Sequence, residues 1–335
     1  MKVCVVGAGA IGGYVAAKLA LAGSAVSVVI RGAHLAAVRA TGLTLHEGGT
    51  TRVVKEIAAT DNISDIGAQN IVILAMKAHQ VTAIADKLAP LLGSDTTIVT
   101  MQNGIPFWYF QKHGGEFDGR RVESVDPGGY ISDHIPVERV IGSVVYPACE
   151  MVAPGVIQHI EGNRFPVGEL DGADTLRVKA IAELFKNAGL KSPVLKSIRE
   201  EIWLKLWGNL TFNPISALTQ ATLVDICQFP PSRALAASMM TEAQTIANKL
   251  GIEFRVSLEK RIAGAEGVGK HKTSMLQDVE AGRALEIEAL VGSVMELGRL
   301  TQTPTPHIDA VYACTSLLAK MLRESGGRLA ISKAS

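Results

Sequence analysis

A stripe of polar residues in an apolar stretch beyond the middle of the chain has the composition of a ligand site. Lys205, Asn209 and Asn213 follow one another at intervals of four, so a helix would place all three on one face. The residues around them are mostly Leu, Trp and Phe, which predicts a buried helix. Because buried ammonium and amide groups need partners, we expect the stripe to face a cleft. The alternative is that Lys205 extends to water and the two Asn residues cap neighbouring segments. We expect Pro214 to end or kink this helix.

A second polar constellation follows some sixty residues later. Residues 264–270 imitate the start of a nucleotide-binding P-loop, but His271 stands where that motif requires Ser or Thr, and no strand precedes it. We interpret the segment as a glycine-rich connection that presents Ser274 at the start of a helix. On spacing alone, Glu286 is typical of a solvated helix residue.

These residues need a scaffold, and its first element is a glycine-rich turn at the N-terminus. The turn lies between a predicted strand over residues 2–6 and a predicted helix over residues 14–22 that starts inside the motif. In this context Gly7 permits a tight turn, Gly9 lets a pyrophosphate approach the backbone, and Gly12 lets the helix pack against the strand. A helix N-terminus also favours phosphate groups. We therefore predict dinucleotide binding, rather than a plain glycine-rich turn, for the residues Gly7, Ala8, Gly9, Ala10, Ile11 and Gly12.

Arg31 comes directly after the second predicted strand, residues 25–30. In this type of βαβ unit an acidic residue near this position binds the ribose 2′-hydroxyl of NAD, whereas an Arg accommodates the 2′-phosphate of NADP. A planar guanidinium can pair bidentately with that phosphate. Arg31 therefore favours NADP(H) over NAD(H), although an exposed loop arginine has the same appearance.

Lys77 and Asn103 follow two further predicted strands, residues 69–75 and 97–101. Ligands of an open parallel sheet lie beyond the carboxyl ends of its strands. We therefore expect both side chains to face the same crevice as the glycine-rich turn. Taken singly, Lys77 would be interpreted as a solvated loop residue, and Asn103 with Gly104 as a simple turn pair.

The remaining pattern predicts an α/β protein with two domains. The β-branched runs after an irregular excursion at residues 107–133 suggest an antiparallel extension of the sheet, followed by a helix and a short strand. Their ranges are 139–146, 155–160 and 165–168 for the extension, 173–188 for the helix and 193–195 for the strand. From Ser197 onward only helices are expected. We predict a Rossmann domain with a doubly wound sheet over residues 1–196 and an all-helical domain over residues 197–335.

Composition narrows the class of protein and its location. The chain has 33 Lys and Arg against 32 Asp and Glu, and its basic residues form no long run, which argues against nucleic-acid and membrane-surface partners. The four cysteines have no metal-ligand spacing, so we expect no metal site. With no signal peptide and no membrane-spanning run expected, we predict a cytoplasmic protein. The apolar C-terminal helices leave both a monomer and a homodimer open.

Taken together, the motifs resemble those of the ketopantoate reductase family, the 2-dehydropantoate 2-reductases of pantothenate biosynthesis. The resemblance covers nearly the whole chain. It is carried by GAGAIG from Gly7, MKAHQ around Lys77, QNGI around Asn103, KLWGNLTFNPISAL from Lys205 and TSMLQDVEAGRALEIE around Ser274 and Glu286. It implies an N-terminal Rossmann domain and a helical C-terminal domain, with NADPH in the cleft between them.

The resemblance also implies roles for the candidate residues. Arg31 and Lys77 would contact the adenosine end of NADPH, and Asn103 would lie near the nicotinamide and the substrate. The residues of the second domain would act on the substrate: Lys205 as the general acid, Asn209 and Asn213 at the substrate's oxygens, Ser274 at its carboxylate, and Glu286 at both the nicotinamide ribose and the catalytic lysine.

The implied reaction is the reduction of a 2-oxo acid, 2-dehydropantoate, by NADPH. A hydride that arrives at a ketone carbon leaves an alkoxide, which a protonated lysine can stabilise and protonate. Two departures from the family pattern leave another 2-oxo or hydroxy acid open as the substrate of a related NADP-dependent dehydrogenase. One is the length of the 107–133 excursion, and the other is the lack of an obvious substrate-binding Asn after Asn213. A non-catalytic NADP(H)-binding sensor is the alternative of another class.

Overall fold

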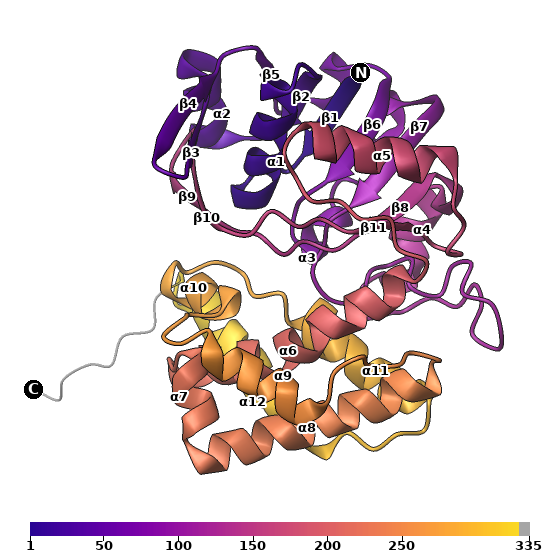
Figure 1. Cartoon of the computed structure of the whole chain (residues 1–335), viewed down its shortest axis with the longest axis vertical. Coiled ribbons are helices and arrows are strands. Elements are labelled where there is room, and N and C mark those ends of the chain that lie inside the picture. Colours follow the sequence, from indigo (N-terminus) through magenta and orange to yellow (C-terminus); the bar gives the residue numbers. More distant parts are fainter. Residues whose placement is uncertain (328–335) are drawn as a thin grey trace, which may run out of the picture. The chain divides into compact units, whose positions relative to one another are not determined.

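The computed structural model describes residues 1–327 of the chain. The chain forms two compact units, one built around strands and the other from helices (Figure 1). The first unit comprises Met1–Asn103, Phe107–Arg121 and Asp126–Ile198, and the second comprises Gly104–Pro106, Val122–Val125 and the chain from Arg199 onward. A sheet with helices in the first unit, and helices alone among the described residues of the second, confirm the predicted α/β fold class with a helical C-terminal part.

The first unit is organised around a seven-stranded sheet in the order β11-β8-β7-β6-β1-β2-β5. All neighbouring strands are parallel except β11, which is antiparallel to β8. The strand bounds are β1 (Lys2–Val6), β2 (Ala25–Val29), β5 (Ile57–Thr60), β6 (Gln69–Leu74), β7 (Leu92–Thr100), β8 (Val140–Ser143) and β11 (Val167–Glu169). After β1, the chain adds β2 and then β5 on one side of β1, whereas β6, β7 and β8 are added on its other side. The direction in which strands are added to the sheet therefore reverses at β1. In doubly wound sheets, ligands bind at this switch point.

The central strands read in the sequence as continuous apolar runs because both of their faces are covered. Val3, Cys4, Val5 and Val6 of β1 are fully buried. The helix that follows, α1 (Ala10–Leu21), contacts β1 and β2 of the large sheet and also a second sheet. The predicted strand and helix at the N-terminus are therefore present, with the helix starting inside the glycine motif.

A second, four-stranded sheet in the order β4-β3-β10-β9 packs on α1. Its strands are β3 (Leu43–Glu47), β4 (Thr50–Val54), β9 (Ala148–Ala153) and β10 (Val156–Glu161). The predicted antiparallel extension of the large sheet is correct only for the segment 165–168, which leads into β11. The segment 139–146 contains β8, which pairs in parallel with β7, and the segment 155–160 belongs to β10, which pairs with β3 in the second sheet. Glu47 of β3 anchors this sheet by accepting hydrogen bonds from Tyr14 Oη at 2.9 Å and Lys18 Nζ at 2.9 Å, both on α1.

Several connections of the first unit differ from their predicted form. Residues 193–195 form no strand, and Val194 makes only an isolated bridge to Val167. The excursion after Asn103 is irregular as predicted, but it is packed, since Trp108 is buried and donates to Thr100 Oγ1 at 2.9 Å. The helices of this unit, besides α1, are α2 (Gly32–Thr41), α3 (Ala78–Val81), α4 (Tyr130–His134) and α5 (Leu176–Asn187), and the short 3₁₀ turns are Ile63–Asp65, Ala85–Lys87, Ala89–Leu91, Pro127–Gly129 and Val137–Arg139.

The described residues after Ile198 form helices and no strand, as predicted. The helices are α6 (Ile198–Thr219), α7 (Leu223–Gln228), α8 (Pro230–Lys249), α9 (Leu258–Gly267), α10 (Ser274–Glu280), the π-helical turn η6 (Glu288–Gly292), α11 (Ser293–Leu300) and α12 (Pro306–Glu324). Of the two expectations for Pro214, that it ends or kinks the helix, the first is wrong, because α6 continues past Pro214 to Thr219. Gly264 lies within α9 rather than in a connection, whereas Ser274 is the first residue of α10, as expected.

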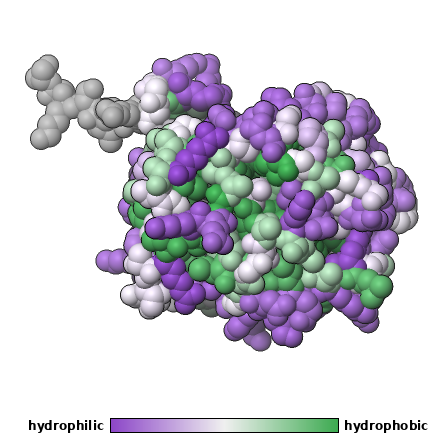
Figure 2. Space-filling view, turned by 90° about the horizontal axis from the view of Figure 1, so that it is seen from above, coloured by the Kyte–Doolittle hydropathy of each residue, from purple (hydrophilic) through white to green (hydrophobic). Residues whose placement is uncertain are grey.

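No helix within residues 1–327 is long and apolar enough to cross a bilayer. In the face shown in Figure 2, hydrophobic residues are scattered among hydrophilic ones. Since more than half of a folded protein's accessible surface is commonly apolar, such scattered residues identify no partner on their own.

Candidate active site

The glycine-rich loop joins β1 to α1 at the switch point of the large sheet. Gly7 has a φ of +87°, and its N–H donates to Val29 O of β2 at 3.0 Å. A Cβ atom at Gly12 would lie 2.3 Å from Gly7 O, so this position admits only glycine at this helix–strand distance. A Cβ atom at Gly9 would meet nothing within 4 Å. The packing of the chain itself therefore does not require a glycine at position 9.

This loop fits the phosphates of a dinucleotide. The first helical hydrogen bond of α1 runs from Gly13 N to Gly9 O at 2.7 Å, so the preceding N–H groups of the first turn have no partner four residues back in the helix. The N-terminus of a helix carries a partial positive charge and attracts phosphate. Open space at Gly9 and this helix terminus are the two features that a pyrophosphate requires.

Three further predicted cofactor residues, Arg31, Lys77 and Asn103, lie at the carboxyl ends of strands that are adjacent in the sheet. Arg31 is exposed and stands at the N-cap of α2, two residues after β2 ends. Lys77 is the N-cap of α3 and follows β6 by three residues, and Asn103 follows β7 by three residues. Since β7, β6, β1 and β2 are consecutive in the sheet order, the topology brings these three residues and the glycine loop to one edge.

Gln102 is a residue of this edge that the sequence interpretation did not single out. Its Nε2 donates to Leu74 O at 2.8 Å and to Met76 O at 3.3 Å, which ties the end of β7 to the turn that carries Lys77. Met76 in turn packs against the glycine loop, since its N atom lies 2.9 Å from the position of a Cβ at Gly7. A half-buried amide after a strand has no distinctive pattern in a single sequence, so only these contacts reveal it.

In the second unit, Lys205 lies on α6 and is half-buried. Burial lowers the pKa of its ammonium group from 10.5 to about 8, and the negative charge of Glu286 acts in the opposite direction. Glu286 stands just before the π-helical turn η6, and its carbonyl accepts from Leu290 N at 3.3 Å. The sequence spacing suggested a solvated helix residue for Glu286. In the structure, however, the negative charge of its carboxylate raises the pKa of Lys205.

The polar stripe on α6 continues from Lys205 towards α10. Asn209 and Asn213 follow at one-turn intervals on the same helix, as predicted. Asn213 is buried, at 5% exposure, and its Nδ2 donates to Ser274 Oγ at 3.3 Å. Thr273 caps α10 by accepting from Leu276 N at 3.3 Å, which places Ser274, an exposed residue, in the first turn. The structure thus brings Asn213 and Ser274 together across 61 residues of sequence.

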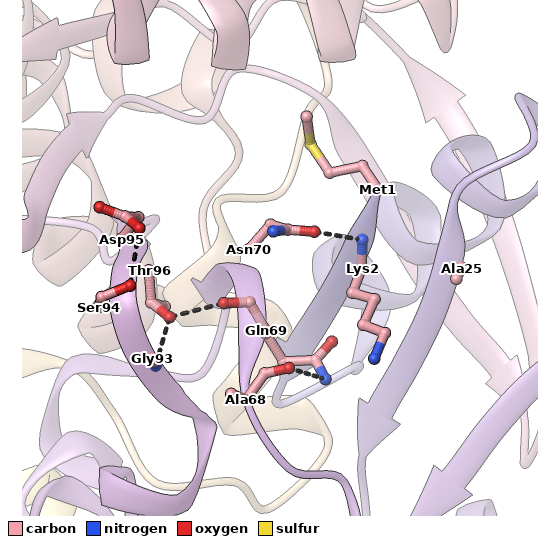
Figure 3. A pocket seen from close by; sticks show the side chains of 10 residues that line it. All are labelled: Met1, Lys2, Ala25, Ala68, Gln69, Asn70, Gly93, Ser94, Asp95 and Thr96. Atoms are coloured by element: carbon pink, nitrogen blue, oxygen red, sulfur yellow. Dashed lines mark hydrogen bonds between the residues drawn. The ribbon is translucent and has the colours of Figure 1, made fainter.

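A hollow of about 450 Å³ lies at the opposite edge of the large sheet (Figure 3). It is lined by residues at the amino ends of β1, β2, β6 and β7, and several of its polar groups pair with one another. Lys2 N–H donates to Asn70 Oδ1 at 2.9 Å, and Thr96 Oγ1 donates to Gln69 O at 2.6 Å. Because ligands of such sheets bind at the carboxyl ends, this hollow is not the candidate site.

The described residues contain no group of three or more His, Cys, Asp and Glu side chains arranged to hold a metal ion. Cys4 and Cys227 are buried, Cys149 is half-buried and Cys314 is exposed. Burial raises the pKa of the Cys4 and Cys149 thiols to about 12, which makes both poor nucleophiles. The candidate chemistry therefore rests on the dinucleotide loop and on the lysine of α6.

A doubly wound sheet with a dinucleotide loop at its switch point, followed by a helical unit that carries a half-buried lysine of lowered pKa, defines the class of nicotinamide-dependent oxidoreductases. Two family descriptions match the chain. "Ketopantoate reductase PanE/ApbA" matches residues 3–109, and "Ketopantoate reductase PanE/ApbA C terminal" matches residues 197–319. The chain belongs to the ketopantoate reductase family.

Individual relatives agree with this assignment. A 2-dehydropantoate 2-reductase of Mesorhizobium japonicum is 55% identical over 320 residues, which cover 95% of this chain and 98% of the relative. A crystal structure from Ralstonia solanacearum, assigned to the ketopantoate reductases, is 42% identical, covers 96% of this chain and 98% of its own, and superposes with a TM-score of 0.92. D-mandelate dehydrogenase with NADH and anilino(oxo)acetate shares the fold at 20% identity, with 96% and 99% coverage and a TM-score of 0.82.

Proposed function

We propose that this protein reduces 2-dehydropantoate to pantoate with NADPH. The observation that carries the proposal is the lysine of α6: burial lowers the pKa of Lys205 to about 8, and its helix face also carries Asn209 and Asn213. A proton donor with a pKa near neutrality is suited to protonate an alkoxide at physiological pH. The 55% identity to a 2-dehydropantoate 2-reductase over nearly the full length of both chains supports the same reaction.

The first unit would hold the cofactor. The loop from Gly7 to Gly12 would bind the pyrophosphate, Arg31 the 2′-phosphate and Lys77 the adenosine end, while Asn103 would lie near the nicotinamide. When it is bound, the nicotinamide supplies the hydride that reduces the ketone. A guanidinium at the N-cap of α2 favours NADPH over NADH because it pairs with a phosphate that NADH lacks.

The second unit would hold and protonate the substrate. Lys205 would donate a proton to the substrate oxygen and stabilise the negative charge that develops on it. Glu286 favours the protonated form of Lys205, since its carboxylate raises the pKa that burial lowers. Asn209 and Asn213 would bind the substrate's oxygens, and the exposed Ser274, bonded to Asn213, would bind its carboxylate.

The domain limits and the location belong to the same proposal. We assign residues 1–196 to the cofactor-binding domain and residues 197–335 to the substrate-binding and catalytic domain. The match of the C-terminal family description, which begins at residue 197, supports this division. A cytoplasmic location is supported by the four cysteines, all of which are free thiols.

We further propose that the chain forms a homodimer through α12. The exposed face of this helix carries small residues in its first half, including Ala313 and Cys314, and large apolar ones in its second half, Leu317 at 58% and Met321 at 43% exposure. An antiparallel pair with the same helix of a second copy sets small residues against large ones, which a two-fold axis allows. A single helix pair buries less than a standard interface, so the association would be weak.

Sedimentation equilibrium tests the homodimer. The wild-type chain should dimerise reversibly at micromolar concentrations, and Leu317→Glu should be a monomer. Leu176→Glu, which changes an 87% exposed leucine on α5 of the first unit, should leave the dimer intact. A wild-type chain that sediments as a monomer up to about 1 mM would refute the proposed association.

The reaction is tested by following NADPH oxidation in the presence of 2-dehydropantoate and of other 2-oxo acids. We expect turnover with 2-dehydropantoate and identify pantoate as the product by mass spectrometry. Turnover restricted to another 2-oxo acid would instead identify a related dehydrogenase. Tight NADPH binding without turnover of any oxo acid would identify a sensor, which has no need of an ammonium group such as that of Lys205.

A further inference from the structure

His34 connects three segments that are remote from one another in the sequence. It lies in the first turn of α2, three residues after Arg31, and it is half-buried. Its Nε2 lies 2.8 Å from Ala8 O of the glycine loop. Its Nδ1 lies 2.8 Å from the backbone N of Gly155, in the turn between β9 and β10. Both contacts are made within the first unit.

The partners determine the tautomer of the ring. A backbone N–H only donates, so Nδ1 of His34 accepts the hydrogen bond from Gly155 and carries no proton. The proton of the neutral imidazole is therefore on Nε2, which donates to the carbonyl of Ala8. Each nitrogen has one partner of the required kind, so the ring is held in a single orientation.

Gly155 is itself held firmly, so it is a rigid support for the ring. Its carbonyl accepts from Thr44 N of β3 at 2.8 Å, and its φ of +79° belongs to the left-handed region that favours glycine. A Cβ atom at this position would lie 3.1 Å from the Cβ of Ala37 on α2. The turn thus packs against α2 on one side and is hydrogen-bonded to the small sheet on the other. Through its two hydrogen bonds, His34 connects this rigid turn to the glycine loop.

The carbonyl that His34 binds is well placed to control the loop. The peptide plane of Ala8 and Gly9 immediately precedes the first turn of α1, and Gly9 N–H donates to Gly7 O at 2.8 Å within the same turn. Fixing the Ala8 carbonyl fixes this plane, and with it the direction from which a phosphate approaches Gly9 and the helix N-terminus. Since His34 lies in the first turn of α2, whose N-cap is Arg31, the same bond holds this turn to the loop.

We propose that His34 is a positioning residue for the dinucleotide: it holds the pyrophosphate loop and the arginine-bearing turn of α2 in a fixed relation. This role rests on the proposed function, in which the loop and Arg31 bind NADPH. His34 touches neither the hydride nor the proton that are transferred, and its loss affects cofactor affinity rather than the chemical step.

The experiment measures the dissociation constant of NADPH by fluorescence titration and the steady-state constants of the full-length enzyme. His34→Ala removes both hydrogen bonds and should weaken NADPH binding about tenfold. The kcat at saturating NADPH and the KM for the oxo acid should stay within about twofold of wild type, because no catalytic group has changed. His34→Phe keeps a ring of similar size without either bond and should weaken binding to the same extent.

A conservative variant separates hydrogen bonding from packing. The amide of His34→Gln offers one acceptor and one donor and should restore most of the affinity lost in His34→Ala. His46→Ala is the matched control, because His46 lies in the same unit, on β3, and its Nδ1 lies 2.8 Å from the hydroxyl of Thr51 on the neighbouring strand β4. That variant should bind NADPH as the wild type does.

The outcomes distinguish the two proposals. A wild-type protein that does not bind NADPH would refute the proposed function itself. If the wild type binds NADPH and His34→Ala and His34→Phe bind it equally well, the positioning role is refuted and the function stands. A lowered melting temperature with unchanged NADPH affinity, or a His34→Gln variant as weak as His34→Ala, would also refute the role.

Discussion

Burial lowers the pKa of Lys205 to about 8, while the carboxylate of Glu286 acts against this shift and favours the charged ammonium. The two effects leave the group protonated at neutral pH and able to release its proton without a large energetic cost. A general acid is most effective when its pKa is near the working pH. This balance leads to the first three predictions.

The reduction of 2-dehydropantoate should lose rate as the pH rises. Below about pH 7 Lys205 carries its proton and kcat should be constant. Above pH 8 the protonated fraction, and with it kcat, should fall about tenfold per pH unit, whereas oxidation of pantoate should become faster. The measurement is a pH profile of kcat in both directions at saturating substrates.

Lys205→Ala should lower kcat by at least about 10²-fold and leave NADPH affinity largely unchanged. Lys205→Arg is its control: a guanidinium keeps the positive charge but does not release a proton in this pH range, so the remaining activity should lack the alkaline decline. Near-wild-type turnover of Lys205→Ala would exclude the lysine from the mechanism.

Replacement of Glu286 should shift the pH profile. In Glu286→Gln the influence that raises the Lys205 pKa is lost, so the alkaline decline of kcat should move to lower pH. Glu288→Gln is a matched control, since Glu288 is a nearby exposed carboxylate that bonds to Tyr312 Oη at 2.9 Å. If both variants keep the wild-type profile, Glu286 does not tune the lysine during turnover.

Two glycines of the same loop should respond differently to alanine. Gly12→Ala places a Cβ 2.3 Å from Gly7 O, so it should lower the melting temperature of the free protein. Gly9→Ala meets no atom within 4 Å, so it should leave that temperature unchanged and instead weaken NADPH binding by about tenfold or more. Scanning calorimetry and NADPH titration measure the two effects. Unchanged NADPH affinity in Gly9→Ala would mean that the pyrophosphate does not approach this glycine.

The choice of cofactor should depend on Arg31. Arg31→Asp replaces a phosphate partner by a repelling carboxylate and should reduce the preference for NADPH over NADH by about 10- to 100-fold. Arg39→Asp provides the comparison, because Arg39 lies on the same helix and its Nε donates to Ala59 O instead. The measurement is the ratio of kcat/KM with NADPH to kcat/KM with NADH in the wild type and in both variants. An unchanged ratio in Arg31→Asp would show that another residue recognises the 2′-phosphate.

Much of the first unit could be predicted from the sequence because the information is local. The run from Lys2 to Val6, the glycines and the alanine-rich helix lie within about twenty residues, and each rule involved applies to neighbouring positions. The stripe of Lys205, Asn209 and Asn213 was equally accessible, since helical periodicity alone places these residues on one face. The motifs also sufficed to recognise the family.

Pairing between distant segments could not be predicted in this way. The strand over residues 156–161 has the β-branched pattern of a large-sheet strand, yet it pairs with β3, more than a hundred residues earlier, because partner choice depends on packing against α1. For the same reason the role of His34 could not be predicted, since its two hydrogen bonds join it to Ala8 and Gly155, which are distant in the sequence. The lowered pKa of Lys205 could not be predicted either, because the burial of the lysine and its position relative to Glu286 arise only in the folded chain. The sequence by itself determined the fold class, the family and the residue types of the site, while tertiary structure alone decided which groups meet and how readily Lys205 gives up its proton.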